Sequence, residues 1–104
     1  MRLMAIFIDT GVFVAARNKS DSNHGRAREL LKSALSGDFG RILTSDYIMD
    51  ESVTLALVRT HNPQIAIDIG HFIMDSPRIE KLVLTEDDFN CAWIKFQKIG
   101  KKFL

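Results

Sequence analysis

The sequence has few of the residues that mark disulfide-rich, linker-rich or low-complexity proteins. Its 104 residues include one cysteine, two prolines and six glycines. The single cysteine, Cys91, excludes an internal disulfide and a metal site built on thiolates, so we expect an intracellular, cytoplasmic protein. So little proline and glycine excludes a chain dominated by linkers or low-complexity segments.

Neither sign of charge dominates, and no apolar run is long. The 14 Lys and Arg residues against 13 Asp and Glu residues give a formal charge of +1. This balance excludes a polybasic protein that binds nucleic acid mainly by neutralising phosphates. No run approaches the ~18 apolar residues of a membrane helix, so we expect no membrane partner. Residues 1–16 resemble a signal peptide, but Asp9 interrupts the apolar core that such a peptide needs.

Apolar runs with strand spacing and helix spacing alternate along the chain. Hydrophobic residues make up 46% of the sequence and charged residues 26%, which is typical of a globular domain. The length fits a single domain, 1–104. We expect strands at 3–8, 41–44 and 79–84, and helices at 11–17, 23–36, 46–60, 63–75 and 85–100.

This alternation predicts an α/β domain with a parallel sheet that helices cover on both faces. The strand at 3–8 is expected to be central and buried on both faces. Ligands of such sheets bind beyond the carboxyl ends of the strands. Polar residues at that edge are therefore the first candidates for function.

Asp9 is the first candidate, because it directly follows the apolar strand at 3–8. A lone carboxylate is costly to bury there. It is either a functional acid at the edge of the sheet or the N-cap of the next helix. Asp9-Thr10-Gly11 also matches the motif of aspartic proteases, but those enzymes are all-β, whereas the segments after residue 22 have helical spacing.

Glu51 is the second candidate, and it lies in the helix expected over 46–60. Helical spacing puts it between Ile48 and Leu55, on an apolar stripe that continues to Val58, whereas Asp50 points roughly 100° away. Glu51 is either an acid at the edge of the stripe that reaches water, or an acid aimed at the carboxyl edge of the sheet.

In the second case, Asp9 and Glu51 would meet at that edge. Two carboxylates that converge repel each other unless a cation lies between them. An all-oxygen site suits Mg²⁺ or Mn²⁺. A metal ion held by few carboxylates, with several waters left, is typical of phosphodiester chemistry.

Three stretches of the sequence have to be considered together. Residues 8–13, I-D-T-G-V-F, carry Asp9 at the end of a strand, residues 43–51, L-T-S-D-Y-I-M-D-E, end on Glu51, and residues 84–92 lead into the last expected helix. In this order they resemble the PIN-domain family of metal-dependent ribonucleases, especially the toxins of VapBC-type toxin–antitoxin pairs. Asp9 looks like that family's first metal-site Asp, Glu51 matches its second acid, and residues 84–92 resemble the approach to its third acid motif.

The resemblance implies a three-layer α/β/α fold with a parallel sheet of about five strands, of which three are expected here. It implies Mg²⁺ or Mn²⁺ held by a cluster of acids that includes Asp9 and Glu51 as catalytic metal ligands, and hydrolysis of an RNA substrate. It also implies a homo-oligomer, usually a dimer, and a cognate antitoxin protein that covers the acidic cleft.

The family's third acid follows a strand that would begin at Phe103-Leu104, where this sequence stops. We therefore expect a truncated PIN-like domain that lacks its C-terminal strands and helix. Two functions stay open: a ribonuclease toxin that is weak or inactive with two acids, and a non-catalytic remnant that binds an antitoxin or another partner. The absent strand would lie beside the strand at 3–8, which leaves that strand an unpaired apolar edge.

Overall fold

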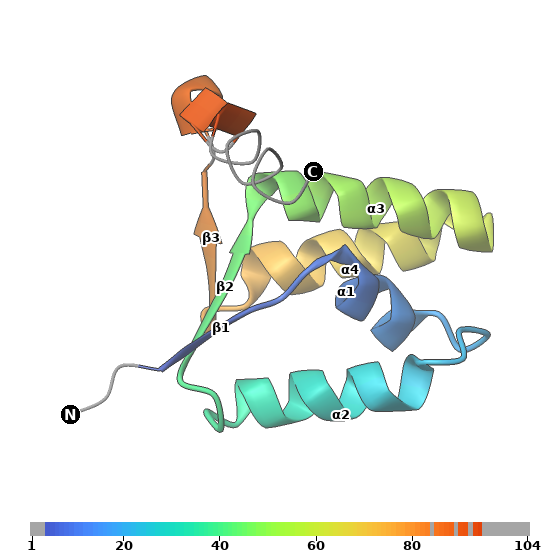
Figure 1. The fold of residues 1–104 in the computed structure, drawn as a ribbon. Helices are drawn as coiled ribbons and strands as arrows, with labels where there is room; N and C mark the ends of the chain where they lie inside the picture. Colours follow the sequence, from blue (N-terminus) through green and yellow to red (C-terminus); the bar gives the residue numbers. More distant parts are fainter. Residues whose placement is uncertain (1–3, 84, 89, 92, 95–104) are drawn as a thin grey trace, which may run out of the picture.

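The structure is a computed structural model that describes residues 4–83, 85–88, 90, 91, 93 and 94. Its elements, in chain order, are β1 (Ala5–Phe7), α1 (Thr10–Arg17), α2 (His24–Leu35), β2 (Arg41–Ser45), α3 (Asp46–Thr60), α4 (Pro63–Asp75) and β3 (Ile79–Leu82) (Figure 1). Each lies within two residues of its predicted bounds, and the α/β class is confirmed. Among the described helices, none combines the length and hydropathy that crossing a membrane requires.

The strands form one parallel sheet in the order β1-β2-β3. Phe7 of β1 pairs with Leu43 of β2, and Ser45 of β2 pairs with Leu82 of β3. Because the strands are parallel, their carboxyl ends lie at the same edge. The expectation that β1 is central is wrong for the described sheet, in which β1 is an edge strand whose outer edge pairs with no other described strand.

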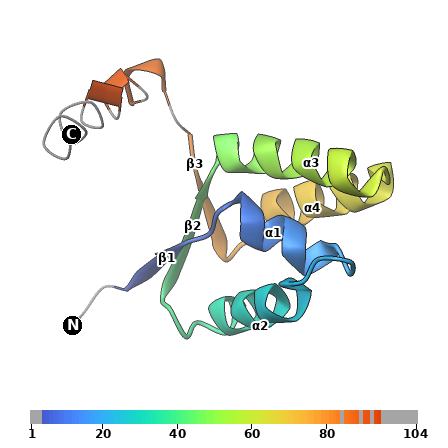
Figure 2. The same cartoon turned by 45° about the vertical axis from the view of Figure 1, so that its right-hand side comes forward.

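Helices α1 to α4 all lie on one face of this sheet (Figures 1 and 2). The connections from β1 to β2 and from β2 to β3 step in the same direction, so right-handed crossovers put their helices on the same side. On the other face, Phe7 stays 53% exposed and Leu82 44% exposed. The described residues thus form two of the three expected layers, and β1 is buried on one face instead of both.

Local interactions mark the starts of α3 and α4 and the end of α2. The Ser45 side chain accepts a hydrogen bond from the Ile48 N–H at 3.1 Å and so caps α3. The Asn62 side chain accepts one from the Gln64 N–H at 3.0 Å and caps α4. Gly37 adopts a φ of +92° just after α2, in the left-handed region that commonly ends a helix.

The core lies between the sheet and the four helices. Phe13 of α1 and Phe72 of α4 meet edge to face, with ring centroids 6.3 Å apart. Burial of this apolar set is the main force that holds the helices on the sheet. Its buried members are Ile8, Phe13, Val14, Leu31, Ala34, Ile42, Ala56, Ala66, Ile69, Ile73 and Ile79.

The residues that α3 buries are not those of the apolar stripe that the sequence predicts. Ser52 and Ala56 are fully buried, whereas Val58, which the spacing put on the apolar stripe, is 62% exposed. Ser52 fits the core because its hydroxyl donates to the Ile48 carbonyl at 2.6 Å, which leaves no unpaired polar group. Glu51 therefore lies on the exposed flank of the buried face instead of within it.

The last predicted elements are described only in part. The helix expected over 85–100 is described at 85–88, 90, 91, 93 and 94, and these residues are helical from 86 onward. Three residues of its predicted apolar face, Phe89, Ala92 and Phe96, lie outside the described residues. So does the strand expected to begin at Phe103-Leu104.

The substitution Gly40→Ala tests the close approach of Met4 to the residue that precedes β2. The φ of Gly40 is +77°, and a Cβ there would lie 2.3 Å from the Met4 carbonyl oxygen, which accepts the Arg41 N–H. We expect Gly40→Ala to lower the free energy of unfolding by more than the ~1–2 kcal/mol of a left-handed L residue, because the backbone of β1 must also move. Urea denaturation measures the change.

The matched control is Gly25→Ala in α2, where the new Cβ has no described atom within 4 Å apart from its chain neighbours and the backbone of its own helix. That variant should be neutral or more stable by up to about 1 kcal/mol, because alanine is the better helix former. Equal stability of the two alanine variants would contradict the close approach of Met4 to Gly40.

Candidate functional site

The carboxyl ends of β1 and β2 meet at one edge of the sheet, and a helix starts from each. The Ile8 N–H donates to the Leu43 carbonyl at 2.9 Å, and the buried Thr44 hydroxyl donates to the Ile8 carbonyl at 3.0 Å. These bonds bring Asp9 level with Ser45, so α1 and α3 begin at adjacent strand ends and pack against each other. The carboxyl edge of the sheet, where Asp9 lies, is therefore the position that the sequence predicts for a ligand site.

Asp9 occupies the N-cap position of α1 without capping it. Its backbone is extended, with φ −99° and ψ 178°, and its side chain makes no capping hydrogen bond. The N-cap interpretation is thus right about the position and wrong about the bond. The carboxylate is exposed, and its neighbour Gly11 has no side chain to cover it. A ligand can therefore reach Asp9 without breaking a bond of the helix.

Asp9 lines a hollow of about 370 Å³, which we call the Asp9 hollow, bordered by α1, α2 and the end of α3. Arg26 of α2 and Arg59 of α3 line it as well, and both are exposed. Neither makes an ion pair with a residue that the structure describes. Sequence reasoning missed them because they belong to different helices, and no local motif connects them.

Glu51 lines a separate, shallow depression along α3, together with Tyr47 and Asp50. The structure thus places the two predicted acids in hollows of their own, although their helices start at adjacent strand ends. Their joint action on one metal ion stays a prediction.

The oxygen donors for a metal ion are few in the described part of the chain. No three Asp, Glu, His or Cys side chains lie together there. Mg²⁺ keeps several waters and often takes only one or two carboxylates besides substrate phosphates. Asp9 and Glu51 match that requirement in kind and number, but they do not form a closed metal centre by themselves.

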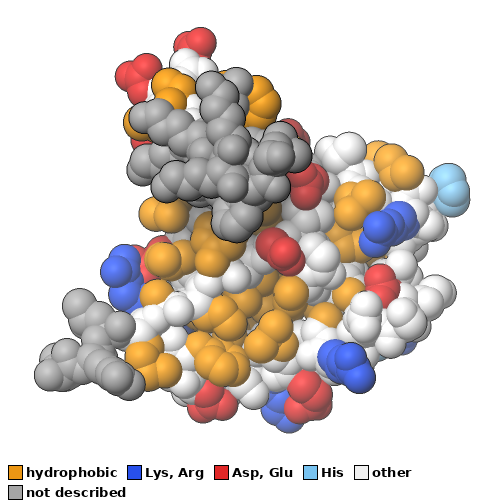
Figure 3. All heavy atoms as spheres, in the orientation of Figure 1, with side chains coloured by type: hydrophobic (Ala, Val, Ile, Leu, Met, Phe, Trp, Pro, Cys, Tyr) orange, Lys and Arg blue, Asp and Glu red, His pale blue; other side chains and the backbone are white. Residues whose placement is uncertain are grey.

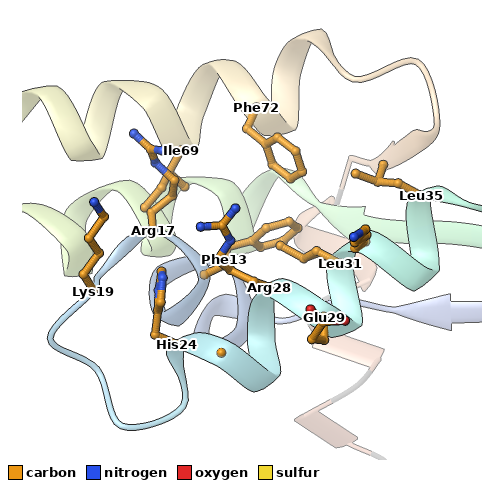
Figure 4. Close-up of a pocket in the computed structure, with 13 residues that line it drawn as sticks. Phe13, Arg17, Lys19, His24, Arg28, Glu29, Leu31, Leu35, Ile69 and Phe72 are labelled. Atoms are coloured by element: carbon orange, nitrogen blue, oxygen red, sulfur yellow. The ribbon is translucent and has the colours of Figure 1, made fainter.

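A second, larger hollow of about 640 Å³ lies between α1, α2 and α4, and we call it the helical groove (Figure 4). Its floor is apolar. Phe13 of α1 and Phe72 of α4 point toward each other there, with Leu31 and Leu35 of α2 beside them. The groove leaves part of the core accessible from outside.

The rim of the helical groove carries four basic side chains, Arg17, Lys19, Arg28 and Lys32, and one acid, Glu29. Arg17 pairs with Asp68 of α4, whose pKa is lowered first by a hydrogen bond from the Gln64 amide and further by the Arg17 guanidinium. The other three basic side chains make no ion pair with a described residue. The groove therefore presents an apolar floor beside a rim on which positive charges outnumber negative ones.

Known proteins resemble this chain in sequence and in fold, while no protein-family model matches it. A VapC ribonuclease from Archaeoglobus fulgidus is 35% identical over 52 residues, which are 50% of this chain and 33% of that protein. The crystal structure of Mycobacterium tuberculosis VapC20, described as a sarcin-ricin loop cleaving toxin, matches with a TM-score of 0.74. The match covers 86% of this chain and 65% of that chain, at 27% identity.

The predicted resemblance to PIN-domain proteins of the VapC type is confirmed. The fold that this chain shares with the solved VapC toxin accounts for the parallel sheet, whose carboxyl edge carries Asp9. The chain spans about a third of the curated VapC ribonuclease and 65% of the solved toxin. What those VapC proteins cleave is therefore a basis for proposals about this chain.

Thr44 tests the geometry of the strand edge. Its side chain is fully buried, and its hydroxyl bonds to the Ile8 carbonyl. We expect Thr44→Val, which keeps the shape and removes the hydroxyl, to lower the free energy of unfolding by about 1–3 kcal/mol. Thr54→Val on the exposed side of α3 is the matched control and should change it by less than about 0.5 kcal/mol. Equal losses in urea denaturation would contradict the buried bond.

Proposed function

We propose that this chain is a metal-dependent ribonuclease of the PIN type and the toxin of a toxin–antitoxin pair. The observation that carries the proposal is Asp9, an exposed carboxylate at the carboxyl edge of a VapC-type sheet that does not cap its helix. The relative from Archaeoglobus fulgidus is named a ribonuclease, which supports RNA as the substrate. The single cysteine favours a cytoplasmic location, where the chain would bind its RNA substrate.

In this proposal, Asp9 and Glu51 are catalytic residues that hold Mg²⁺ or Mn²⁺. The chemistry that the ion supplies when bound is activation of a water and neutralisation of charge on the scissile phosphate. Asp9 contributes a carboxylate that no hydrogen bond of α1 engages, and Glu51 contributes one from the exposed flank of α3. Because two carboxylates hold a divalent ion weakly, we expect slow cleavage by the purified chain.

Asp9→Asn keeps the shape of the side chain and removes its charge. We expect it to lower the rate of RNA cleavage in Mn²⁺ by roughly 100-fold or more, because an amide gives the ion no neutralising charge. Asp38→Asn, at an exposed acid after α2, should keep the rate of the parent chain. Cleavage of labelled RNA by purified protein measures both variants.

The matched control for a substitution of Glu51 is its neighbour in α3, Asp50. Asp50 is also exposed and lies in the same depression, but it points roughly 100° away. We expect Glu51→Gln to weaken Mn²⁺ binding in titration calorimetry and to slow cleavage, while Asp50→Asn does neither. Cleavage that survives Asp9→Asn and Glu51→Gln would refute the assigned metal site.

The helical groove favours a second function, which is binding of a partner protein without catalysis. An apolar floor beside a basic rim fits an amphipathic segment that carries acidic side chains along one edge. For a VapC-type chain, we take this partner to be the cognate antitoxin. The homo-oligomer that the resemblance implied stays a prediction, which light scattering tests.

Neutralising the rim separates the two functions. We expect the double variant Arg28→Gln, Lys32→Gln to weaken antitoxin binding by roughly 10-fold, about 1.4 kcal/mol, because two unpaired charges leave the groove. Arg41→Gln is the control, since its guanidinium bonds Glu80 at 2.8 Å on the sheet. Antitoxin binding that is equal for all three proteins in calorimetry would exclude the groove. Binding without any RNA cleavage by the parent chain would favour the second function.

A further inference from the structure

We infer that Arg26 and Arg59 are positioning residues that hold a single strand of RNA in the Asp9 hollow, through phosphates next to the one that is cleaved. The inference rests on the proposed ribonuclease function. It assigns to two residues that line the same hollow as Asp9 a role that the metal ligands do not perform, which is to hold the strand near Asp9.

The two guanidinium groups have no competing structural role. Arg17 and Arg41 pair with Asp68 and Glu80, whereas Arg26 and Arg59 have no such partner among the described residues. A contact between a free guanidinium and a phosphate therefore breaks no internal salt bridge, and it releases counterions from the RNA. Guanidinium is also the side chain that matches phosphate oxygens in a bidentate geometry.

The charge of the Asp9 hollow supports this role. Asp9 and Asp21 balance the two arginines while the hollow holds no ion, and the Asp21 carboxylate already accepts the Asn23 N–H at 2.8 Å. A divalent cation held by Asp9 would make the hollow net positive. The hollow would then attract a phosphate backbone to the side chains that line it.

The shape of the hollow favours a single strand. The arginines approach from two helices, Arg26 from the first turn of α2 and Arg59 from the last turn of α3. Between these helices, Val12 and Ala15 of α1 and Leu30 of α2 supply apolar lining. A hollow of about 370 Å³ with basic and apolar walls suits a strand whose bases are unpaired and can leave the stack.

The test measures RNA binding in the Asp9→Asn background, in which the proposed cleavage is blocked. Affinity for a single-stranded oligoribonucleotide is measured by fluorescence anisotropy over a series of salt concentrations. We expect Arg26→Gln and Arg59→Gln each to flatten the plot of log K against log salt concentration by about 0.7, the value for one phosphate contact on a single strand. Arg41→Gln removes the same charge at the opposite end of β2 and should leave the slope unchanged.

A second readout uses chains that keep Asp9. There, Arg26→Gln and Arg59→Gln should raise KM for RNA more than they lower kcat, because they hold the strand and do not touch the reacting atoms. Urea denaturation should show parent-like stability for both variants, which a structural role would not. A change confined to one arginine would remove the other from the assignment.

The outcomes separate this inference from the ribonuclease proposal. The inference alone would be overturned if the Arg26, Arg59 and Arg41 variants bind RNA with the same salt dependence while the chain that keeps Asp9 still cleaves RNA. A parent chain that neither binds nor cleaves RNA would overturn both. If the Arg26 and Arg59 variants flatten the salt dependence of binding to an antitoxin peptide but not that of binding to RNA, the hollow would be reassigned to the antitoxin.

Discussion

The parallel register between β1 and β2 is the constraint on which the rest of the structure depends. It is fixed by the Ile8 N–H on the Leu43 carbonyl and by the buried Thr44 hydroxyl on the Ile8 carbonyl. A slip by one residue would turn Ile8 out of the core and Asp9 into it, because side chains alternate between the faces of a strand. Asp9 is thus placed by bonds that other residues make, which leaves its own carboxylate free for a ligand.

The single-sided arrangement of the helices makes α1 a wall shared by both hollows. Val12 and Ala15 line the Asp9 hollow, whereas Phe13 and Arg17 line the helical groove on the other side of the same two turns. The opposite face of the sheet holds Phe7 and other exposed apolar side chains, and hydrophobic groups gather on the side of the molecule that carries β1 (Figure 3). Catalysis and partner binding, as proposed, therefore depend on the position of one short helix.

Features set by local interactions could be predicted from the sequence, and features set by distant contacts could not. The caps at Ser45 and Asn62 were predictable because each bonds an amide two or three residues away. The buried face of α3 was missed because Ser52, counted as polar, satisfies its hydroxyl within the helix. Asp9 was found from its place after an apolar strand, whereas Arg26 and Arg59 meet only in the folded chain. The edge position of β1 depends on strand order, which apolar spacing does not contain.

The net charge says little about how this chain would bind a polyanion, because some of its basic side chains form ion pairs and others do not. Arg41 is bound to Glu80, whose pKa it lowers by hydrogen bonding, and Arg17 is bound to Asp68, so these charges are compensated where they lie. The cations of the Asp9 hollow and most of those on the groove rim have no such partner among the described residues. A total of +1 still excludes binding by bulk phosphate neutralisation. It permits local binding, because the field within a hollow is set by the few charges that line it, and here those charges adjoin the exposed carboxylate of Asp9.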